Sequence, residues 1–235
     1  MSDRAARIGH ALVLGDGEAP TRAGLDAAWP GWDDGVGLVV AADGGARLAA
    51  TLGIRLDRWV GDADSFPAAD VDGLAAAGVQ TRLVAIAKDE SDLELAVLEA
   101  IDGALARVTI LGGLGGPRLD HELANLALLA HPALDGIDAR LLDDRTRVRL
   151  VSADPACSPV TVRLDGRPGD LVSLLPLGSA VSGITTVGLE YPLADEALGP
   201  GPARGLSNVR STREASVTVR GGRLLVVETV GTVGG

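Results

Sequence analysis

The chain has 235 residues, enough for one large domain or two smaller ones. Its net charge of −11 argues against nucleic acids and anionic membranes as partners, because both attract basic surfaces. The single cysteine, Cys157, excludes an intrachain disulfide, and with three histidines it makes a structural zinc site a poor explanation. No apolar run approaches the roughly 20 residues that span a bilayer, and no signal-peptide pattern is visible, so we expect a cytoplasmic protein.

The first part of the chain alternates between short apolar runs and helix-like segments. Apolar residues recur at helical spacing from Leu93 to Ile101 and again from Leu119 to Ala130. Alternating strands and helices predict a parallel, Rossmann-like sheet covered on both faces, with ligands bound beyond the carboxyl ends of its strands. The runs typical of buried parallel strands lie at 11–14, 38–42, 58–60, 83–86 and 108–111.

The pattern changes near residue 145 to strand-like runs without a convincing helix. Gly221 and Gly222 stand between the last two runs and predict a two-residue hairpin turn. We therefore predict an α/β catalytic domain over 1–148 and an antiparallel β-sandwich domain over 149–235. The downstream runs lie at 160–164, 171–175, 184–187, 216–219 and 224–227.

Two aspartates, Asp62 and Asp64, stand two residues apart directly after the third run. Carboxylates at this spacing converge on one cation if the backbone turns, and Mg²⁺ prefers oxygen ligands. A solvated loop, or a helix cap supplied by Ser65, explains the same residues. Taken alone, this motif favours a metal site and a plain loop equally.

A second charged segment follows the fourth run and contains the only lysine of the chain, Lys88. Asp89 or Ser91 can cap the helix that follows, and an acid such as Asp92 suits its first turn. Capping does not explain Lys88, which precedes the helix. A lysine at a strand end can neutralise a phosphate group, or it can be a solvated surface residue.

Glycines follow the second and fifth runs. An Asp-Gly-Gly triplet begins at Asp43 and fits either a nucleotide contact or a helix cap. Four glycines between 112 and 116 precede Arg118 and His121. Glycine lets a backbone approach phosphate and arginine pairs with it, although a plain turn and a half-buried histidine explain the same residues.

These motifs share one expected location, the carboxyl edge of a parallel sheet. They also share one chemistry, carboxylates with a few cations and flexible glycines, which is what the transfer of phosphoryl groups from a magnesium nucleotide requires. Neither a Walker A motif nor a complete GxGxxG motif is clearly present, so the pattern differs from ordinary nucleotide-binding loops.

The order of the motifs resembles that of the thiamine pyrophosphokinase family, over roughly residues 10–228. The segments that carry the resemblance are Ala42-Asp43-Gly44-Gly45-Ala46, Gly61-Asp62-Ala63-Asp64-Ser65, Lys88-Asp89-Glu90-Ser91-Asp92, Gly115-Gly116-Pro117-Arg118-Leu119-Asp120-His121, Gly188-Leu189-Glu190-Tyr191-Pro192-Leu193 and Arg204-Gly205-Leu206-Ser207-Asn208. Ala63 departs from the family, which usually has a bulkier residue there, and Val209 stands where an acid often follows.

The resemblance implies an enzyme that transfers a pyrophosphoryl group from ATP to thiamine, giving thiamine diphosphate and AMP, with Mg²⁺ as cofactor. It also implies a homodimer with active sites between subunits. The metal ligands it implies are Asp43, Asp62, Asp64 and Asp92. The catalytic groups it implies are Asp62, Asp64, Lys88, Asp92, Arg118, Asp120 and His121. The nucleotide contacts it implies are Asp43, Gly44, Gly45, Ser65, Asp89, Gly115, Gly116 and Arg118, and the thiamine contacts are Asp92, Ser207 and Asn208.

Two other functions stay open at this point. One is a pyrophosphokinase that acts on another hydroxymethyl heterocycle, such as a pterin. The other is a non-catalytic, nucleotide-binding regulatory protein on the same fold. In the favoured function Asp92 is a candidate general base, and Asp64→Asn is expected to abolish turnover while the fold is kept.

Overall fold

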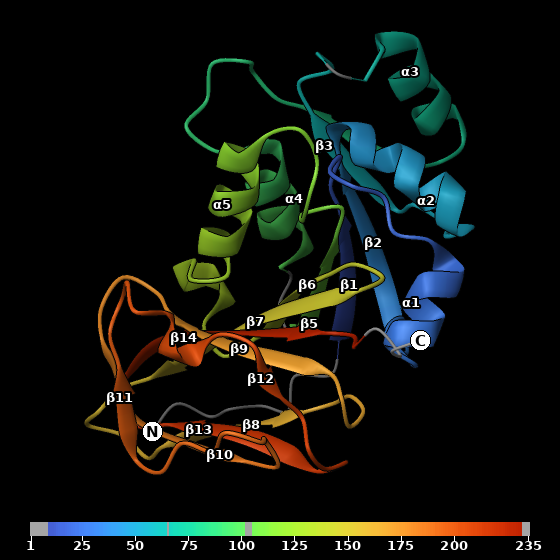
Figure 1. Cartoon of the computed structure of the whole chain (residues 1–235). Coiled ribbons are helices and arrows are strands. Elements are labelled where there is room, and N and C mark those ends of the chain that lie inside the picture. The colour runs from blue at the N-terminus through green and yellow to red at the C-terminus, as the bar shows by residue number, and fades with distance from the viewer. Residues whose placement is uncertain (1–8, 65, 102–104, 232–235) are drawn as a thin grey trace. The chain divides into compact units, whose positions relative to one another are not determined.

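The computed structural model describes residues 9–64, 66–101 and 105–231. The chain divides into two compact units, 1–144 and 145–235 (Figure 1). This division lies shortly before the predicted boundary after residue 148, and it keeps the whole of strand β7 (Thr146–Ala153) in the second unit. None of the helices in the described part of the chain is long and apolar enough to span a membrane.

The first unit contains a parallel sheet with the strand order β6-β5-β1-β2-β3-β4. Leu12 of the central strand pairs with Val39 on one side and Thr109 on the other, so the strand order reverses around this strand. The predicted parallel sheet is therefore confirmed. Its strands are β1 (Gly9–Leu14), β2 (Val36–Ala42), β3 (Arg58–Gly61), β4 (Gln80–Leu83), β5 (Leu105–Leu111) and β6 (Asp138–Leu142).

Helices cover both faces of this sheet, with α4 and α5 on one side and α1 and α2 on the other (Figure 1). Ser91 caps α4 by accepting a hydrogen bond from the Glu94 amide at 3.1 Å, and the predicted apolar face of that helix is buried. The α-helices are α1 (Arg22–Ala28), α2 (Ala46–Leu52), α3 (Ala68–Ala76), α4 (Asp92–Ala100) and α5 (Leu119–Leu128). Short 3₁₀ turns lie at Asp43–Gly45 and Pro132–Leu134.

Two sequence predictions for this unit were wrong in detail. The fourth strand is Gln80–Leu83 rather than 83–86, because its pairing with β3 places it before the apolar run, and as an edge strand it is exposed. The second predicted helix forms and buries Leu128, but Leu119 and Leu123 of its predicted apolar face are 67% and 56% exposed. Spacing identified the helix without identifying the side that packs.

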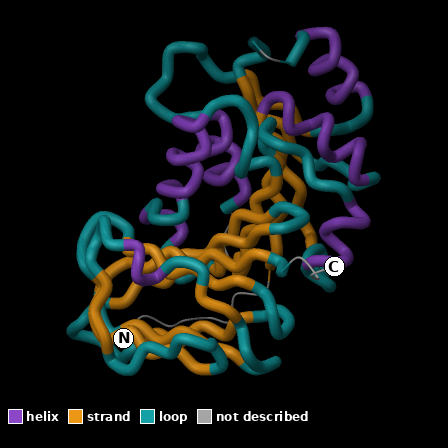
Figure 2. The backbone as a smooth tube through the Cα atoms, in the orientation of Figure 1, coloured by secondary structure: helices purple, strands orange, loops and turns teal. Residues whose placement is uncertain are grey.

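The second unit is the predicted antiparallel β-sandwich, built almost entirely of strands and loops (Figure 2). Its sheets have the orders β12-β9-β14-β7 and β11-β10-β13-β8, and apolar residues from both form one core. A 3₁₀ turn lies at Ala203–Gly205. The strands that follow β7 are β8 (Val160–Leu164), β9 (Leu171–Pro176), β10 (Val181–Val187), β11 (Glu196–Leu198), β12 (Asn208–Val209), β13 (Ala215–Val219) and β14 (Gly222–Thr229).

The predicted hairpin at Gly221 and Gly222 is wrong. β13 pairs with β10 and β8, whereas β14 pairs with β7 and β9 in the other sheet. The two glycines therefore lie where the chain passes between sheets, and the Ser182 amide bonds to the Gly221 carbonyl at 2.9 Å. Two adjacent strand-like runs joined by glycines fit either a hairpin within one sheet or a crossing from one sheet to the other. Only the packing of their apolar faces distinguishes these two arrangements.

His10, near the start of β1, is a buried histidine. Its burial makes the free energy of unfolding depend on pH. Its ring nitrogens lie 3.0 Å from the Asp34 carbonyl and 2.9 Å from the Thr109 hydroxyl, which a neutral ring satisfies as one donor and one acceptor. Burial lowers the pKa of His10 below its usual 6.5. The unfolded chain therefore binds this proton more readily, so the stabilisation is present above pH 6.5 and is lost as the pH falls toward the lowered pKa.

We expect His10→Asn to flatten the dependence of the unfolding free energy on pH below 6.5, where one proton contributes at most about 1.4 kcal/mol per pH unit. Urea unfolding between pH 7 and 5 measures this slope. His121→Asn makes the same substitution at an exposed histidine and is the matched control. Equal slopes in wild type and His10→Asn would contradict the assignment.

Candidate active site

A cavity of about 600 Å³ lies at the carboxyl ends of β1, β2, β3 and β5. This is the edge where the strand order reverses, which is the usual ligand position in open α/β sheets. The stretches that follow these four strands contribute to its wall, together with residues 89–93, which lead into α4, and with α5. Its lining includes Asp16, Asp43, Asp64, Asp89, Asp92, Gly115, Gly116, Arg118, His121 and Asn125.

Three carboxylates converge at this edge. Asp43 follows β2, Asp62 follows β3 and Asp92 begins α4, and each offers an oxygen such that all three oxygens lie within 4.8 Å of one another. Asp43 is only 5% exposed. Hard oxygen donors at this spacing suit a small divalent cation such as Mg²⁺. Asp64, the fourth predicted ligand, lines the cavity but lies outside this cluster.

The backbone that carries these aspartates takes unusual conformations. Asp43 has φ +44° and Ala63 has φ +63°, in the left-handed region that side chains other than glycine, asparagine and aspartate rarely enter. The Trp59 indole N–H donates to the Asp43 carbonyl at 2.9 Å, and the Asp64 amide donates to Asp62 Oδ1 at 3.1 Å. The turn at Ala63 folds the two-aspartate motif back on itself and keeps the Asp64 side chain beside Asp62, although only Asp62 belongs to the three-carboxylate group.

Lys88 bridges two of the three carboxylates. Its Nζ lies 2.8 Å from Asp62 Oδ2 and 2.9 Å from Asp92 Oδ1, and its side chain is only 13% exposed. The hydrogen bond from Lys88 holds the pKa of Asp62 below its usual value, although burial opposes this. Burial acts to lower the pKa of Lys88, but its bonds to Asp62 and Asp92 outweigh burial and raise it. Both partners are therefore charged at neutral pH.

A close approach of two loops forms another wall of the cavity. The amides of Gly15 and Gly17, after β1, donate at 2.8 Å to the carbonyls of Leu111, the last residue of β5, and Gly112, which follows it. A side chain at Gly15 would place its Cβ 2.7 Å from the Gly112 carbonyl oxygen, so only glycine permits this contact. The paired loops extend the β1–β5 ladder beyond the sheet and leave the backbone open to the cavity.

The glycine segment after β5 leads into exposed charged residues. Arg118, which precedes α5, pairs with Asp120 at 2.5 Å, and this bond lowers the pKa of the Asp120 carboxyl to about 2. Gly115, Gly116 and His121 line the cavity beside Arg118. Arg118 and His121 therefore present basic groups to the side of the cavity where the glycines expose backbone.

The structure brings most of the predicted residues of the first unit together around this cavity. Gly44 and Gly45 form a buried turn against the β1 loop, where any side chain at Gly45 would overlap the Leu14 carbonyl. Asp120 is exposed and pairs with Arg118. Ser65, a predicted nucleotide contact, lies outside the described residues.

The predicted thiamine contacts in the second unit are positioned by their own backbone and side-chain bonds. Ser207 has φ +56°, and its amide donates to the Ser173 hydroxyl at 3.0 Å. Asn208 is buried; its amide group accepts from the Tyr191 amide at 3.0 Å and donates to the Tyr191 carbonyl at 2.6 Å. Asn208 therefore ties β12 to the segment around Tyr191, a structural role that sequence reasoning did not anticipate.

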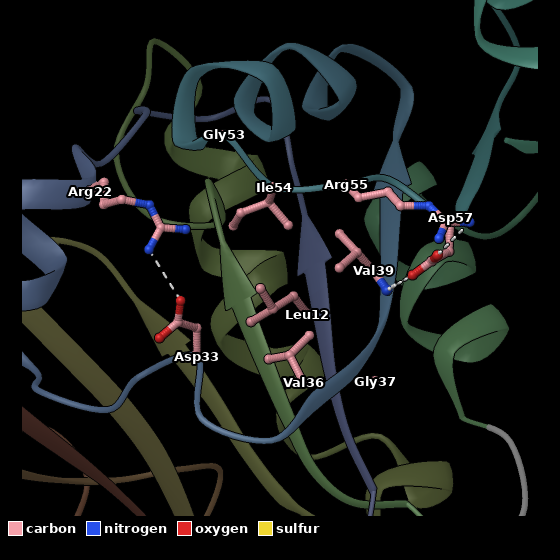
Figure 3. Close-up of a pocket in the computed structure, with 10 residues that line it drawn as sticks. All are labelled: Leu12, Arg22, Asp33, Val36, Gly37, Val39, Gly53, Ile54, Arg55 and Asp57. Atoms are coloured by element: carbon pink, nitrogen blue, oxygen red, sulfur yellow. Dashed lines mark hydrogen bonds and ion pairs between the residues drawn. The ribbon is translucent and has the colours of Figure 1, made fainter. Parts of the chain in front are cut away.

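A second cavity, of about 350 Å³, lies beside β1 and β2 in the same unit (Figure 3). Its charged side chains already pair: Arg22 with Asp33 at 3.1 Å, and Asp57 with the Val39 amide at 2.9 Å. Its lining includes the apolar Leu12, Val36, Val39 and Ile54. Because its charges are paired and its walls are apolar, the residues of this cavity are explained by their role in the fold. The acidic cavity differs in this respect.

Comparison with known proteins decides the family. Residues 33–141 match the family described as thiamin pyrophosphokinase, catalytic domain, and residues 159–224 match thiamin pyrophosphokinase, vitamin B1 binding domain. The chain belongs to the thiamin pyrophosphokinase family. The catalytic match contains the whole acidic cluster, and the B1-binding match contains Ser207 and Asn208.

Individual thiamin pyrophosphokinases agree with this assignment. The chain is 26% identical over 163 residues to the thiamine pyrophosphokinase of Bacillus subtilis (strain 168), which covers 69% of this chain and 73% of that protein. A crystal structure of the B. subtilis protein has a TM-score of 0.78 at 22% identity and covers 95% of this chain and 100% of that one. The structure from Geobacillus thermodenitrificans has a TM-score of 0.74 at 25% identity, with coverages of 96% and 99%.

Asp16 and Asn125 are among the cavity residues that the sequence did not predict. Asp16 follows β1, and Asn125 of α5 donates to the Gly113 carbonyl at 2.9 Å, which holds the glycine segment in place. The segment at Asp16 carried a usable signal, because an acid between two glycines directly follows an apolar run. Asn125 carried no such signal, since an amide inside a helix pattern has no distinctive neighbours.

Proposed function

We propose that the acidic cavity of the first unit binds ATP with Mg²⁺ and transfers a pyrophosphoryl group to the hydroxyl of thiamine. Family membership makes the chain a thiamine diphosphokinase, with thiamine diphosphate and AMP as products. The observation that carries the site assignment is the convergence of Asp43, Asp62 and Asp92 within 4.8 Å at the edge where the strand order reverses. The pterin-type and non-catalytic alternatives find no support in the matches above.

The residues present fit Mg²⁺ because all three donors are carboxylates and one of them is almost fully buried. When bound, the ion supplies positive charge that neutralises the triphosphate. Asp43, Asp62 and Asp92 would hold it, and Asp64 is a fourth candidate from the cavity wall. Four acids without a cation would repel an anionic nucleotide, so the metal requirement follows from the charge of the site.

The remaining groups of the cavity have separate roles in pyrophosphoryl transfer. Gly115 and Gly116 expose backbone to the phosphates, and Arg118 and His121 approach the same side. The acceptor oxygen attacks the β-phosphorus, the bond from that phosphorus to the oxygen shared with the α-phosphate breaks, and AMP leaves with its electron pair. Asp92 is the proposed acceptor of the hydroxyl proton. Positioning and charge neutralisation supply most of the acceleration in such reactions.

The thiamine contacts and the assembly belong to the same proposal. Ser207 and Asn208 lie within the matched B1-binding region, which supports their predicted role near thiamine. A homodimer with active sites between subunits and a location in the cytoplasm remain predictions. Sedimentation velocity tests the first of these, with a mass near 48 kDa, twice the 23.8 kDa chain, as the expected result.

The activity is tested by mixing the protein with ATP, MgCl₂ and thiamine and measuring AMP and thiamine diphosphate. We expect both products in equal amounts, and neither when EDTA removes the metal. A hydroxymethylpterin in place of thiamine is the matched control and should give no AMP. AMP that forms without thiamine would point to hydrolysis or to another acceptor and would contradict the proposal.

A further inference from the structure

Lys88 lies between two proposed metal ligands, a position that its predicted role beside phosphate does not explain. We infer that the Lys88 ammonium is the resident counter-cation of the ligand-free metal site and is exchanged for the divalent metal when the site is loaded. This inference rests on the proposed function, because it assumes that Asp43, Asp62 and Asp92 bind a metal.

The first support is geometric. Lys88 Nζ is 2.8 Å from Asp62 Oδ2 and 2.9 Å from Asp92 Oδ1, so it occupies oxygens of two of the three carboxylates. The other oxygen of Asp62, Oδ1, accepts the Asp64 amide at 3.1 Å. Both Asp62 oxygens are therefore engaged, and the cation among their partners is Lys88.

The second support is the balance of charge. Three carboxylates with oxygens within 4.8 Å repel one another, and two of them, Asp43 and Asp62, are largely shielded from water. Lys88 relieves part of this repulsion, and its 13% exposed side chain shows that it is held in the site rather than in solvent. A divalent ion relieves more of it, and an ammonium held among the same oxygens would repel that ion. The Lys88 ammonium and the divalent ion therefore compete for the same carboxylate oxygens.

Exchange reconciles the observed position of Lys88 with its predicted role. The four-carbon stem of lysine lets the ammonium move while its backbone stays at the end of the segment before α4. Residues 89–92, which directly follow Lys88, line the cavity. An ammonium displaced by metal remains close to that wall, where the triphosphate would bind. Metal binding would thus free the positive charge that the transferring group needs.

The first test uses the wild-type protein and the fact that Lys88 is its only lysine. An N-hydroxysuccinimide acetate label reacts with free amines, so within the chain it reports Lys88 and the terminal α-amine separately by peptide mass spectrometry. We expect saturating MgCl₂ without ATP to raise the labelling rate of Lys88 severalfold, because the amine leaves its two carboxylates and its side chain, 13% exposed without metal, becomes accessible to the reagent. The α-amine rate should not change. An unchanged Lys88 rate at saturating metal would overturn the exchange.

The second test measures Mn²⁺ binding to the ATP-free protein by electron paramagnetic resonance. We expect Lys88→Met to bind Mn²⁺ about tenfold more tightly than wild type, since the internal competitor is gone. Arg82→Met is the matched control, because it removes one positive charge from an exposed ion pair with Glu99. If wild type binds Mn²⁺ and Lys88→Met binds it equally well or more weakly, the exchange is overturned but the metal site is not. Absence of Mn²⁺ binding in both proteins would overturn the metal site itself.

Discussion

Asp62→Asn is expected to lower kcat for AMP formation by about 10²–10³-fold or more, the usual loss when one group that stabilises transferring charge is removed. Asp62 is at the centre of the acidic cluster: it offers an oxygen to the three-carboxylate group, and it also bonds Lys88 and the Asp64 amide. Asparagine keeps the size of the side chain and removes its charge. The loss should therefore appear as weaker metal binding and slower transfer with an intact fold.

The experiment compares initial rates of AMP formation at saturating ATP and thiamine, with circular dichroism to verify folding. Asp72→Asn, on the exposed side of α3, is the matched control and should keep wild-type activity. Asp64→Asn distinguishes two arrangements. Because Asp64 lies outside the cluster, we now expect it to lose less activity than Asp62→Asn. Near-normal turnover in Asp62→Asn would show that the cluster does not hold the metal.

Glu228→Gln is expected to destabilise the second unit by about 3–5 kcal/mol, the usual cost of leaving buried charges without their partner. Glu228 of β14 faces Arg147 of β7 across the sheet and pairs with it at 2.8 Å, and Arg149 approaches the same carboxylate at 3.2 Å. Glu228, Arg147 and Arg149 are all buried. Arg147 also donates to the Asp165 carbonyl at 2.7 Å, beyond β8 of the other sheet. Glutamine keeps the shape but leaves two arginines without their shared carboxylate.

Urea unfolding and hydrogen exchange of peptides from β7 and β14 measure this effect. Glu214→Gln changes the charge equally at an exposed position in the same unit and should stay within about 0.5 kcal/mol of wild type. The three tryptophans, Trp29, Trp32 and Trp59, all lie in the first unit, so their fluorescence reports that unit separately. Wild-type protection of β7 and β14 in Glu228→Gln would show that the buried ion pairs contribute little.

Buried charges are arranged differently in the two units. In the second unit Glu228 is enclosed by arginines and serves the fold. In the first unit the carboxylates of Asp43, Asp62 and Asp92 are gathered beside an open cavity, and Lys88 pairs with two of them, Asp62 and Asp92. Carboxylates gathered at a cavity repel one another, and a bound cation relieves that repulsion, so such a cluster serves binding rather than packing.

Much of the architecture followed from local patterns. The apolar run at 108–111 became the end of β5, and the face from Leu93 to Ala100 became the buried side of α4. Buried strands and amphipathic helices are readable because their side-chain period reflects which face meets the core. The edge strand β4 was misplaced for the same reason, since an exposed strand has no apolar period to follow.

The sequence by itself determined the edge of the sheet on which the chemistry lies, because aspartates, glycines and Lys88 follow successive parallel strands, and the order of those motifs indicated the family. Only the tertiary structure decided which carboxylates meet. Asp64 stays next to Asp62 across the left-handed turn at Ala63, yet the cluster is completed by Asp43, which follows β2, and by Asp92, which begins α4. Such proximity depends on backbone torsions and on pairing between distant segments. For that reason the spacing of two aspartates in the chain indicated a metal site without naming its ligands.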